Sequence, residues 1–184
     1  SIIALQDIGE SDPDFTRIDD FANDFFNTSN YDSTPSNSLN HFDPELVGQN
    51  FLNNNIRTVS NVGNGFSKYS NLIVEGTDYT VLENARKLDE NEYILNEKLG
   101  FISLNQSLNN DEILAIAFQY TYMGKVYQVG EFSSDANNSG SSVTDSSLIL
   151  KMLKSNLNDV RQPVFKLMMK NIYNIGSYQV NLED

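Results

Sequence analysis

The sequence contains no cysteine and only one histidine, His41. Without cysteine the chain has no disulfide, no thiolate nucleophile and no thiolate ligand for zinc. A serine hydrolase needs a nucleophile, a base and an orienting acid, and the sequence has no G-x-S-x-G motif. His41 follows a polar stretch, and no motif in the sequence supplies it with a nucleophile. We therefore interpret His41 as a surface residue.

Positive charge is also scarce. The formal net charge is −13, and residues 1–56 hold ten Asp and Glu against the single base Arg17. Phosphate backbones are bound mainly by Lys and Arg, which displace counterions, so an acidic surface repels nucleic acid. The composition therefore predicts no nucleic-acid partner and no attraction to anionic membranes.

Long apolar runs are absent as well. No segment approaches the roughly 20 apolar residues that a membrane helix needs, and no signal-peptide pattern opens the chain. The chain begins at Ser1 and stops at Asp184, which we interpret as cut points in a longer polypeptide. Its 184 residues, 39% hydrophobic and 20% charged, are typical of one packed domain. We therefore expect residues 1–184 to form a single domain excised from a larger protein.

Two polar stretches, 27–40 and 133–147, are rich in turn formers and predict flexible surface loops. Before the first loop, apolar residues spaced by three and four predict a helix, and on both sides of it short apolar runs predict strands. The predicted elements are a strand at 2–8, helices at about 14–26 and 44–52, a strand at 56–62, and a turn at Asn64-Gly65.

From about residue 70 the apolar period becomes two, which indicates strands. The predicted strands are 71–75, 79–83, 99–104 and 112–123, and a reversal at Gly124-Lys125 makes a hairpin over 113–132. Residues 148–153 are apolar but fit a strand or a helix at this length. Pro163 starts a helix with the apolar stripe Val164, Leu167, Met168 and Ile172.

These elements predict an α+β fold, mainly antiparallel β. We expect a sheet or sandwich in which the hairpin 113–132 is packed by two or three short helices. The hairpin and the helix at 163–173 are predicted to form the folded centre.

Several polar patterns resemble catalytic or metal sites. Paired carboxylates can serve a glycosidase if a cleft separates their pKa values, but these pairs lie in polar stretches and predict surface charge. The pairs are Asp19/Asp20, Glu90/Glu92 and Asp111/Glu112. Residues 135–140 copy the opening of a calcium loop, yet position twelve is Ser146 where a bidentate Glu is needed. Gly63-Asn-Gly65 lacks the third glycine of a phosphate loop. We predict no catalytic, cofactor-binding or metal-binding residue.

Apolar candidates for binding have a simpler interpretation too. Met152, Met168 and Met169 suit either an adaptable partner surface or the core, and their helical spacing favours the core. Aromatic residues can line a sugar platform, although strand alternation assigns half of them to the core. They are Phe101, Phe118, Tyr120, Tyr122 and Tyr127.

Specific phrases of the sequence carry a resemblance. They are ARKLDENEYILN at 85–96, LGFISLNQ at 99–106, ILAIAFQYTY at 113–122, YQVGEF at 127–132, LILKMLK at 148–154, PVFKLMMKNIYNI at 163–175, and the opening IIALQDIGE. In this order and spacing they are similar to a stretch of the SprA (Sov) family, the outer-membrane translocon of the type IX secretion system in gliding bacteria. The resemblance is close over 72–132 and 148–176, and weak over 10–70 and 133–147.

The resemblance implies a parent protein that forms a very large outer-membrane β-barrel, through which folded substrates reach the cell surface. It implies as partners other segments of the parent, a smaller barrel protein, a periplasmic plug, and substrates with a C-terminal signal domain. Membrane strands alternate over about ten residues with aromatic girdles. This chain has too few of them, so we expect a domain that does not itself span the membrane. The alternative is a cell-surface adhesion or glycan-binding module, and a hydrolase ranks third.

Overall fold

The fold is described from a computed structural model, in residues 1–6, 53–71, 73–133, 147–157 and 159–169. Three predictions lie outside these residues: the helices at 14–26 and 44–52, and the loop at 27–40. Most of the predicted loop 133–147 also lies outside them, although Ser147 at its end is described and buried.

A four-stranded mixed sheet forms the centre, in the order β2-β1-β8-β5. The strands are β1 (Ile2–Leu5), β2 (Tyr79–Leu82), β5 (Leu114–Ile116) and β8 (Leu148–Lys154). β1 runs antiparallel to β2 and parallel to β8, while β5 runs antiparallel to β8. The first described strand therefore lies between two strands that come much later in the chain.

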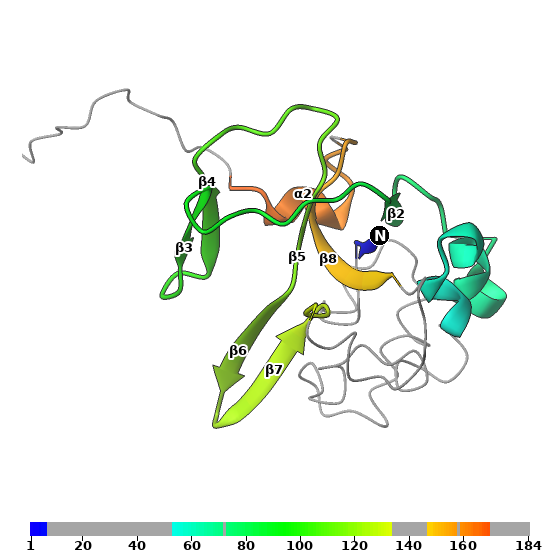
Figure 1. Ribbon diagram of the computed structural model, residues 1–184, viewed down its shortest axis with the longest axis horizontal. Helices are drawn as coiled ribbons and strands as arrows, with labels where there is room; N and C mark the ends of the chain where they lie inside the picture. The colour runs from blue at the N-terminus through cyan, green and yellow to red at the C-terminus, as the bar shows by residue number, and fades with distance from the viewer. Residues whose placement is uncertain (7–52, 72, 134–146, 158, 170–184) are drawn as a thin grey trace, which may run out of the picture.

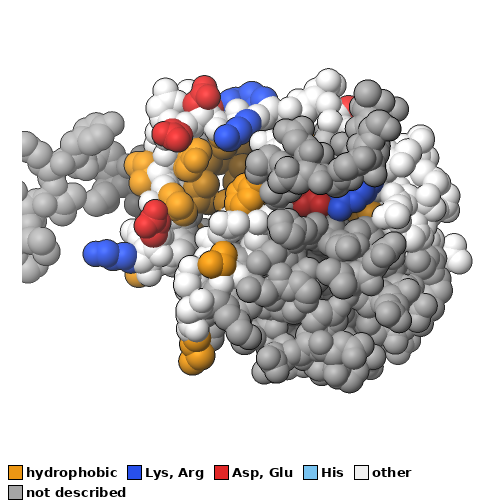
Figure 2. Space-filling view, turned by 60° about the horizontal axis from the view of Figure 1, so that its bottom comes forward, with side chains coloured by type: hydrophobic (Ala, Val, Ile, Leu, Met, Phe, Trp, Pro, Cys, Tyr) orange, Lys and Arg blue, Asp and Glu red, His pale blue; other side chains and the backbone are white. Residues whose placement is uncertain are grey.

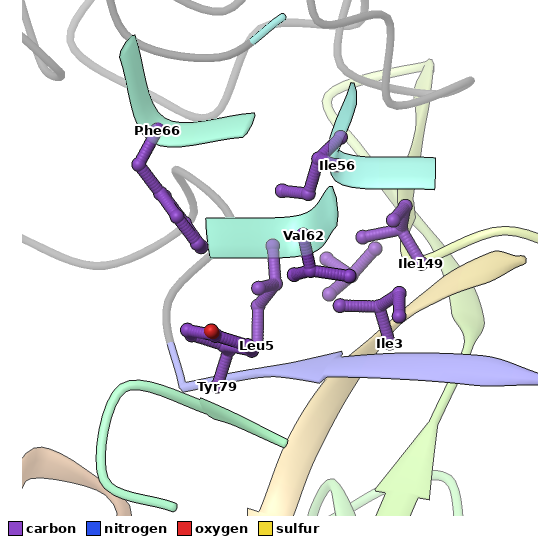
Figure 3. Close-up of a cluster of buried hydrophobic side chains, with 8 residues drawn as sticks. Ile3, Leu5, Ile56, Val62, Phe66, Tyr79 and Ile149 are labelled. Carbon is purple, nitrogen blue, oxygen red and sulfur yellow. The ribbon is translucent and has the colours of Figure 1, made fainter. Parts of the chain in front are cut away.

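One face of this sheet is covered by two 3-10 helices, η3 (Asn54–Arg57) and η4 (Val59–Tyr69). Figure 3 shows Ile56, Val62 and Phe66 of these helices above Ile3 of β1 and Ile149 of β8. All five side chains are buried. Since apolar burial is the main favourable term in folding, this cluster is the largest source of stability that the structure describes.

The opposite face packs against α2 (Pro163–Leu167). Ala4 and Met152 are fully buried there, and Val164 of the helix is packed on them. β1 thus contributes to both clusters, since successive residues of a strand point to opposite faces.

Two hairpins lie apart from the central sheet (Figure 1). One consists of β3 (Tyr93–Asn96) and β4 (Phe101–Leu104), and the other of β6 (Phe118–Tyr122) and β7 (Lys125–Val129). Each is a separate two-stranded sheet among the described residues. The predicted α+β fold, mainly antiparallel with few short helices, is therefore confirmed.

The strand predicted at 56–62 is wrong, because this segment belongs to η3 and η4. Asn53 caps η3, with its side-chain Oδ1 accepting a hydrogen bond from the Asn55 N–H at 2.9 Å. Asn64-Gly65 is not a hairpin turn, as it lies inside η4. Local side-chain hydrogen bonding thus prevails over the apolar spacing here.

Other strand predictions are right in part. Residues 79–83 and 99–104 contain β2 and β4, and the undecided 148–153 lie within β8. In the segment predicted as a strand at 71–75, the described residues 71 and 73–75 form no strand; the Asp78 carboxylate accepts from the Val74 N–H at 2.8 Å and closes a turn instead.

The long strand predicted at 112–123 is broken at Ala117, so β5 pairs with β8 and β6 pairs with β7. As a result the hairpin is not the folded centre; the centre is formed around β1 and β8. α2 has five residues and ends at Leu167, which is exposed, and the next residue, Met168, has an extended backbone. Of the described residues of the apolar stripe predicted for that helix, Val164 is the buried one, while Ile172 lies outside the described part of the chain.

Candidate interaction surface

The β6–β7 hairpin carries exposed apolar side chains along β6, at its tip and on β7. Phe118 and Tyr120 are exposed on β6, with ring centroids 6.2 Å apart. Met123 at the tip is 86% exposed and Val126 on β7 is 45% exposed. The hairpin extends away from the central sheet in Figure 1. Exposed large apolar side chains gathered on one element are typical of a surface that contacts another molecule.

The turn of this hairpin is tight. Met123 has φ 48° and Gly124 has φ 78°, the two positive values of a type I′ turn. This turn lies one residue before the predicted reversal at Gly124-Lys125. Its backbone twist matches that of the paired strands, so it presents the apolar tip on a regular ribbon.

The base of the hairpin is buried, in contrast to its tip. Gln128, Val129 and Glu131 are all buried. Gly130 has φ 76°, and a Cβ there would lie 3.0 Å from the Ile116 carbonyl oxygen. Glycine permits both the backbone conformation and the close approach. The base of the hairpin therefore packs directly against the backbone at Ile116.

Glu131 joins three segments at this base. Its Oε1 accepts from Arg57 Nη2 at 2.6 Å, and its Oε2 accepts from Arg57 Nη1 at 2.9 Å. Oε2 also accepts from the Ile149 N–H at 2.9 Å, and the Glu131 N–H donates to the Ile149 carbonyl at 2.9 Å. A bidentate pair with an added main-chain bond is a strong, directional arrangement. It fixes β7 to β8 and to η3.

A glutamine pair adds a rung on one face of the hairpin. Gln119 Nε2 donates to Gln128 Oε1 at 2.8 Å, and Gln128 Nε2 donates to the Gly130 carbonyl at 2.9 Å. The register places Phe118 and Tyr120 on the opposite face. One face is thus held by polar contacts, while the other presents aromatic rings.

The carboxylate pairs suggested by the sequence form local turns and ion pairs. Glu92 binds both Arg86 Nη1 and Nη2 at 2.7 Å and accepts from the Asp89 N–H at 2.8 Å. The hydrogen bond from Arg86, followed by that from the Asp89 main chain, lowers the pKa of Glu92 to about 2. Glu112 accepts from the Asn109 N–H at 2.7 Å. Neither arrangement holds two carboxyl groups across a cleft.

The structure describes only some of the residues that resemble a catalytic, metal or phosphate site. The described residues contain no group of three His, Cys, Asp or Glu side chains that could hold a metal ion. His41, Asp19, Asp20 and residues 135–140 lie outside the described part of the chain. Gly63-Asn-Gly65 lies in η4, where the Gly65 backbone packs on Ile56.

The methionine and aromatic candidates divide between the core and the surface. Met152 is fully buried, Met168 is half-buried and Met169 is exposed, so the preferred core assignment holds for Met152 alone. Phe101 is half-buried, whereas Phe118 and Tyr120 are exposed.

No local pattern in the sequence indicates Glu131 as an anchor, because its partner Arg57 is 74 residues away. The same holds for buried Lys151, whose Nζ donates to the Gln6 carbonyl. An isolated charge within an apolar strand, such as Lys151 in LILKMLK, is the only sequence signal for either.

Within the described residues, none of the helices has the length and apolar character required to cross a membrane. No known protein family has a profile that matches this chain, and no curated protein sequence matches it.

Proposed function

We propose that this chain is a non-enzymatic structural and interaction domain of the type IX secretion translocon, at the outer membrane or cell surface of a Gram-negative bacterium. The observation that carries the proposal is where the family-like phrases lie. ILAIAFQYTY at 113–122 and YQVGEF at 127–132 form β5, most of the β6–β7 hairpin, and its Glu131 anchor. The phrases thus flank the exposed tip at 123–126 and include Glu131, which holds the base of the hairpin.

The geometry of the hairpin suits binding to another protein better than catalysis. A hairpin anchored by a buried bidentate ion pair loses little conformational entropy when its tip binds. The exposed Met123 and Val126 provide apolar area, and methionine adapts to partners of different shape. Other segments of the parent protein, secretion partners and passing substrates all qualify as occupants of such a surface.

The experiment is made in the native protein within its own bacterium. Met123 and Val126 are replaced together by serine, and surface delivery of proteins with the C-terminal signal domain is measured, along with gliding. We expect several-fold less delivery, with substrates retained inside the cell. Val160→Ser is the control, since Val160 is also exposed but lies outside the hairpin. Unchanged secretion after deletion of the whole gene would overturn the proposal.

A second function, glycan binding at the cell surface, is favoured by one observation. Phe118 and Tyr120 expose neighbouring rings on one face of β6, with an interplanar angle of 31°. Aromatic rings offer large amphipathic contact area to a ligand. Glycan-array binding that is lost in Tyr120→Ala, with secretion intact in the M123S/V126S variant, would replace the translocon proposal with this one.

A further inference from the structure

The geometry points to a second interaction surface, the open edge of β3, as a binding site for an extended segment of another protein. That segment is apolar in its centre and has basic residues at its ends, and it adds a strand to the β3–β4 hairpin. This inference does not depend on the translocon proposal, because it uses only the backbone, the exposed side chains and the charges of the hairpin.

The backbone of β3 has hydrogen-bonding groups to offer. The Glu92 backbone carbonyl accepts from the Asn105 N–H at 2.9 Å, and the ladder pairs Ile94 with Ser103 and Leu95 with Ile102. Hydrogen-bonded and non-hydrogen-bonded pairs alternate along an antiparallel ladder. The Ile94 pair is therefore bonded within the hairpin, while Tyr93 and Leu95 turn their N–H and C=O groups outward.

These outward groups have no partner among the described residues, where the hairpin forms a two-stranded sheet by itself. Two-stranded ribbons are marginally stable in water, and unpaired edge groups are a template for another strand. A third strand would satisfy the Tyr93 and Leu95 backbone and enlarge the sheet.

Nothing in the sequence of β3 protects this edge. Native proteins block open edges with lysine, proline, bulges or inward-pointing charges. Tyr93–Asn96 contains no charged residue and no proline, and its pairing with β4 is regular. Ile94 is 61% exposed on one face and Leu95 is 53% exposed on the other. Figure 2 shows apolar side chains at the surface on the side where the hairpin lies. An added strand would cover apolar area on both faces.

The acidic residues beside β3 favour a basic segment over a second copy of this chain. Glu90 and Glu97 flank β3 at its two ends, and the formal net charge of the chain is −13. A second copy carries the same formal net charge of −13, and two acidic proteins repel each other. A segment with lysine or arginine at both ends is attracted to the same acids, although Lys98 beside Glu97 limits the gain.

The test uses the whole chain and a fluorescein-labelled peptide, Lys-Thr-Val-Thr-Val-Thr-Lys, followed by fluorescence anisotropy and amide chemical shifts. We expect saturable binding that weakens with salt, and shift changes at Tyr93 to Leu95. The same peptide with glutamate ends should bind more weakly. So should a peptide with N-methyl groups on alternate residues, because it cannot pair with the edge.

Leu95→Pro and Ile102→Pro form a matched pair, since these residues face each other across the ladder and each turns its N–H outward. Leu95→Pro should weaken binding by about tenfold, the factor for one lost hydrogen bond, while Ile102→Pro should leave it unchanged. If proline unfolds the hairpin in either variant, the double variant Glu90→Lys/Glu97→Lys is tested instead. This variant should bind the glutamate-ended peptide more tightly than the lysine-ended one.

Three outcomes would overturn the inference. They are no chemical-shift change at β3 with millimolar peptide, equal losses in the two proline variants when both are folded, and a dimer in sedimentation that Leu95→Pro abolishes. The last would assign the edge to a second copy. None of them bears on the secretion assay, which tests the other hairpin.

Discussion

Gly65 is the residue whose small size matters most in the described core. A Cβ at this position would lie 2.6 Å from the Cα, Cβ and backbone N of Ile56, which is fully buried. Backbone atoms cannot rotate away, so η3 and η4 must separate. We predict that Gly65→Ala lowers the free energy of unfolding by about 1–3 kcal/mol, the usual cost of overpacking.

Gly63→Ala is the matched control for this prediction. A Cβ at Gly63 would meet only the Tyr79 hydroxyl, at an ordinary 3.6 Å. Urea unfolding of both variants makes the comparison. Equal losses would show that helix propensity alone, and not the contact with Ile56, determines the effect.

Glu92 gives a prediction on pH. Hydrogen bonds from Arg86 and from the Asp89 main chain lower its pKa from the ordinary value of 4.5 to about 2. A depressed folded-state pKa stabilises the folded turn above pH 4.5, and this stabilisation is lost as the pH falls through about 2. Carbon NMR of the Glu92 carboxyl group should show the low midpoint, and Arg86→Gln should move it upward. An unchanged midpoint in Arg86→Gln would contradict the assigned cause.

Single residues differ in how far sequence predicts them. Spacing indicated that Ile116 and Phe118 belong to strands and that Val164 packs inward, since alternation and helical period are local properties. The partnership of Arg57 with Glu131 is set by the fold, because no local rule links residues 74 apart. The packing role of Gly65 is hidden for the same reason.

At the scale of elements, the anchor of the β6–β7 hairpin allows a direct test. Glu131→Ala removes both bonds to Arg57 and the bond to the Ile149 N–H. Breaking a buried ion pair costs about 3–5 kcal/mol, and we expect the lower end because the Arg57 side chain is 26% exposed. Urea unfolding gives the loss, and hydrogen exchange at Ile149 shows whether the base of the hairpin opens.

Glu92→Ala is the control for this element. Its pair with Arg86 has the same bidentate geometry, at 2.7 Å, but is solvent-exposed, so its removal should cost much less. Glu131→Gln keeps an acceptor for the Ile149 N–H, so its loss of unfolding free energy should lie between those of Glu131→Ala and Glu92→Ala. Equal losses in Glu131→Ala and Glu92→Ala would mean that Glu131 does not anchor the hairpin.

Elements were predicted well where one local signal acts and poorly where two compete. The hairpin turn was found within one residue, because Gly124 follows a clear alternating strand. The break at Ala117 was missed, since alternation continues through it while the pairing partner changes from β8 to β7. The strand predicted at 56–62 is wrong because Asn53 caps a 3-10 helix there, a signal that competes with the apolar spacing.

At the scale of the whole molecule, the strand order is the part that sequence could not provide. β1 pairs with β2 from Tyr79 onward and with β8 from Leu148 onward, so the sheet is closed by contacts between distant segments. Apolar runs predict that these strands exist, but several pairings bury them equally well. A chain with such distant pairings is expected to fold slowly, because long loops must close before the contacts form.

β1 should therefore control the stability of the whole sheet. Ile3 is fully buried, and Ile3→Ala should lower the free energy of unfolding by about 2–5 kcal/mol through lost apolar contact and the cavity left behind. Ile2→Ala removes the same atoms from a half-buried neighbour and should cost less. Because β1 joins β2 to β8, Ile3→Ala should reduce amide protection at Val81 and Leu150 together. Loss at only one of these strands would show that the two sides of the sheet unfold independently.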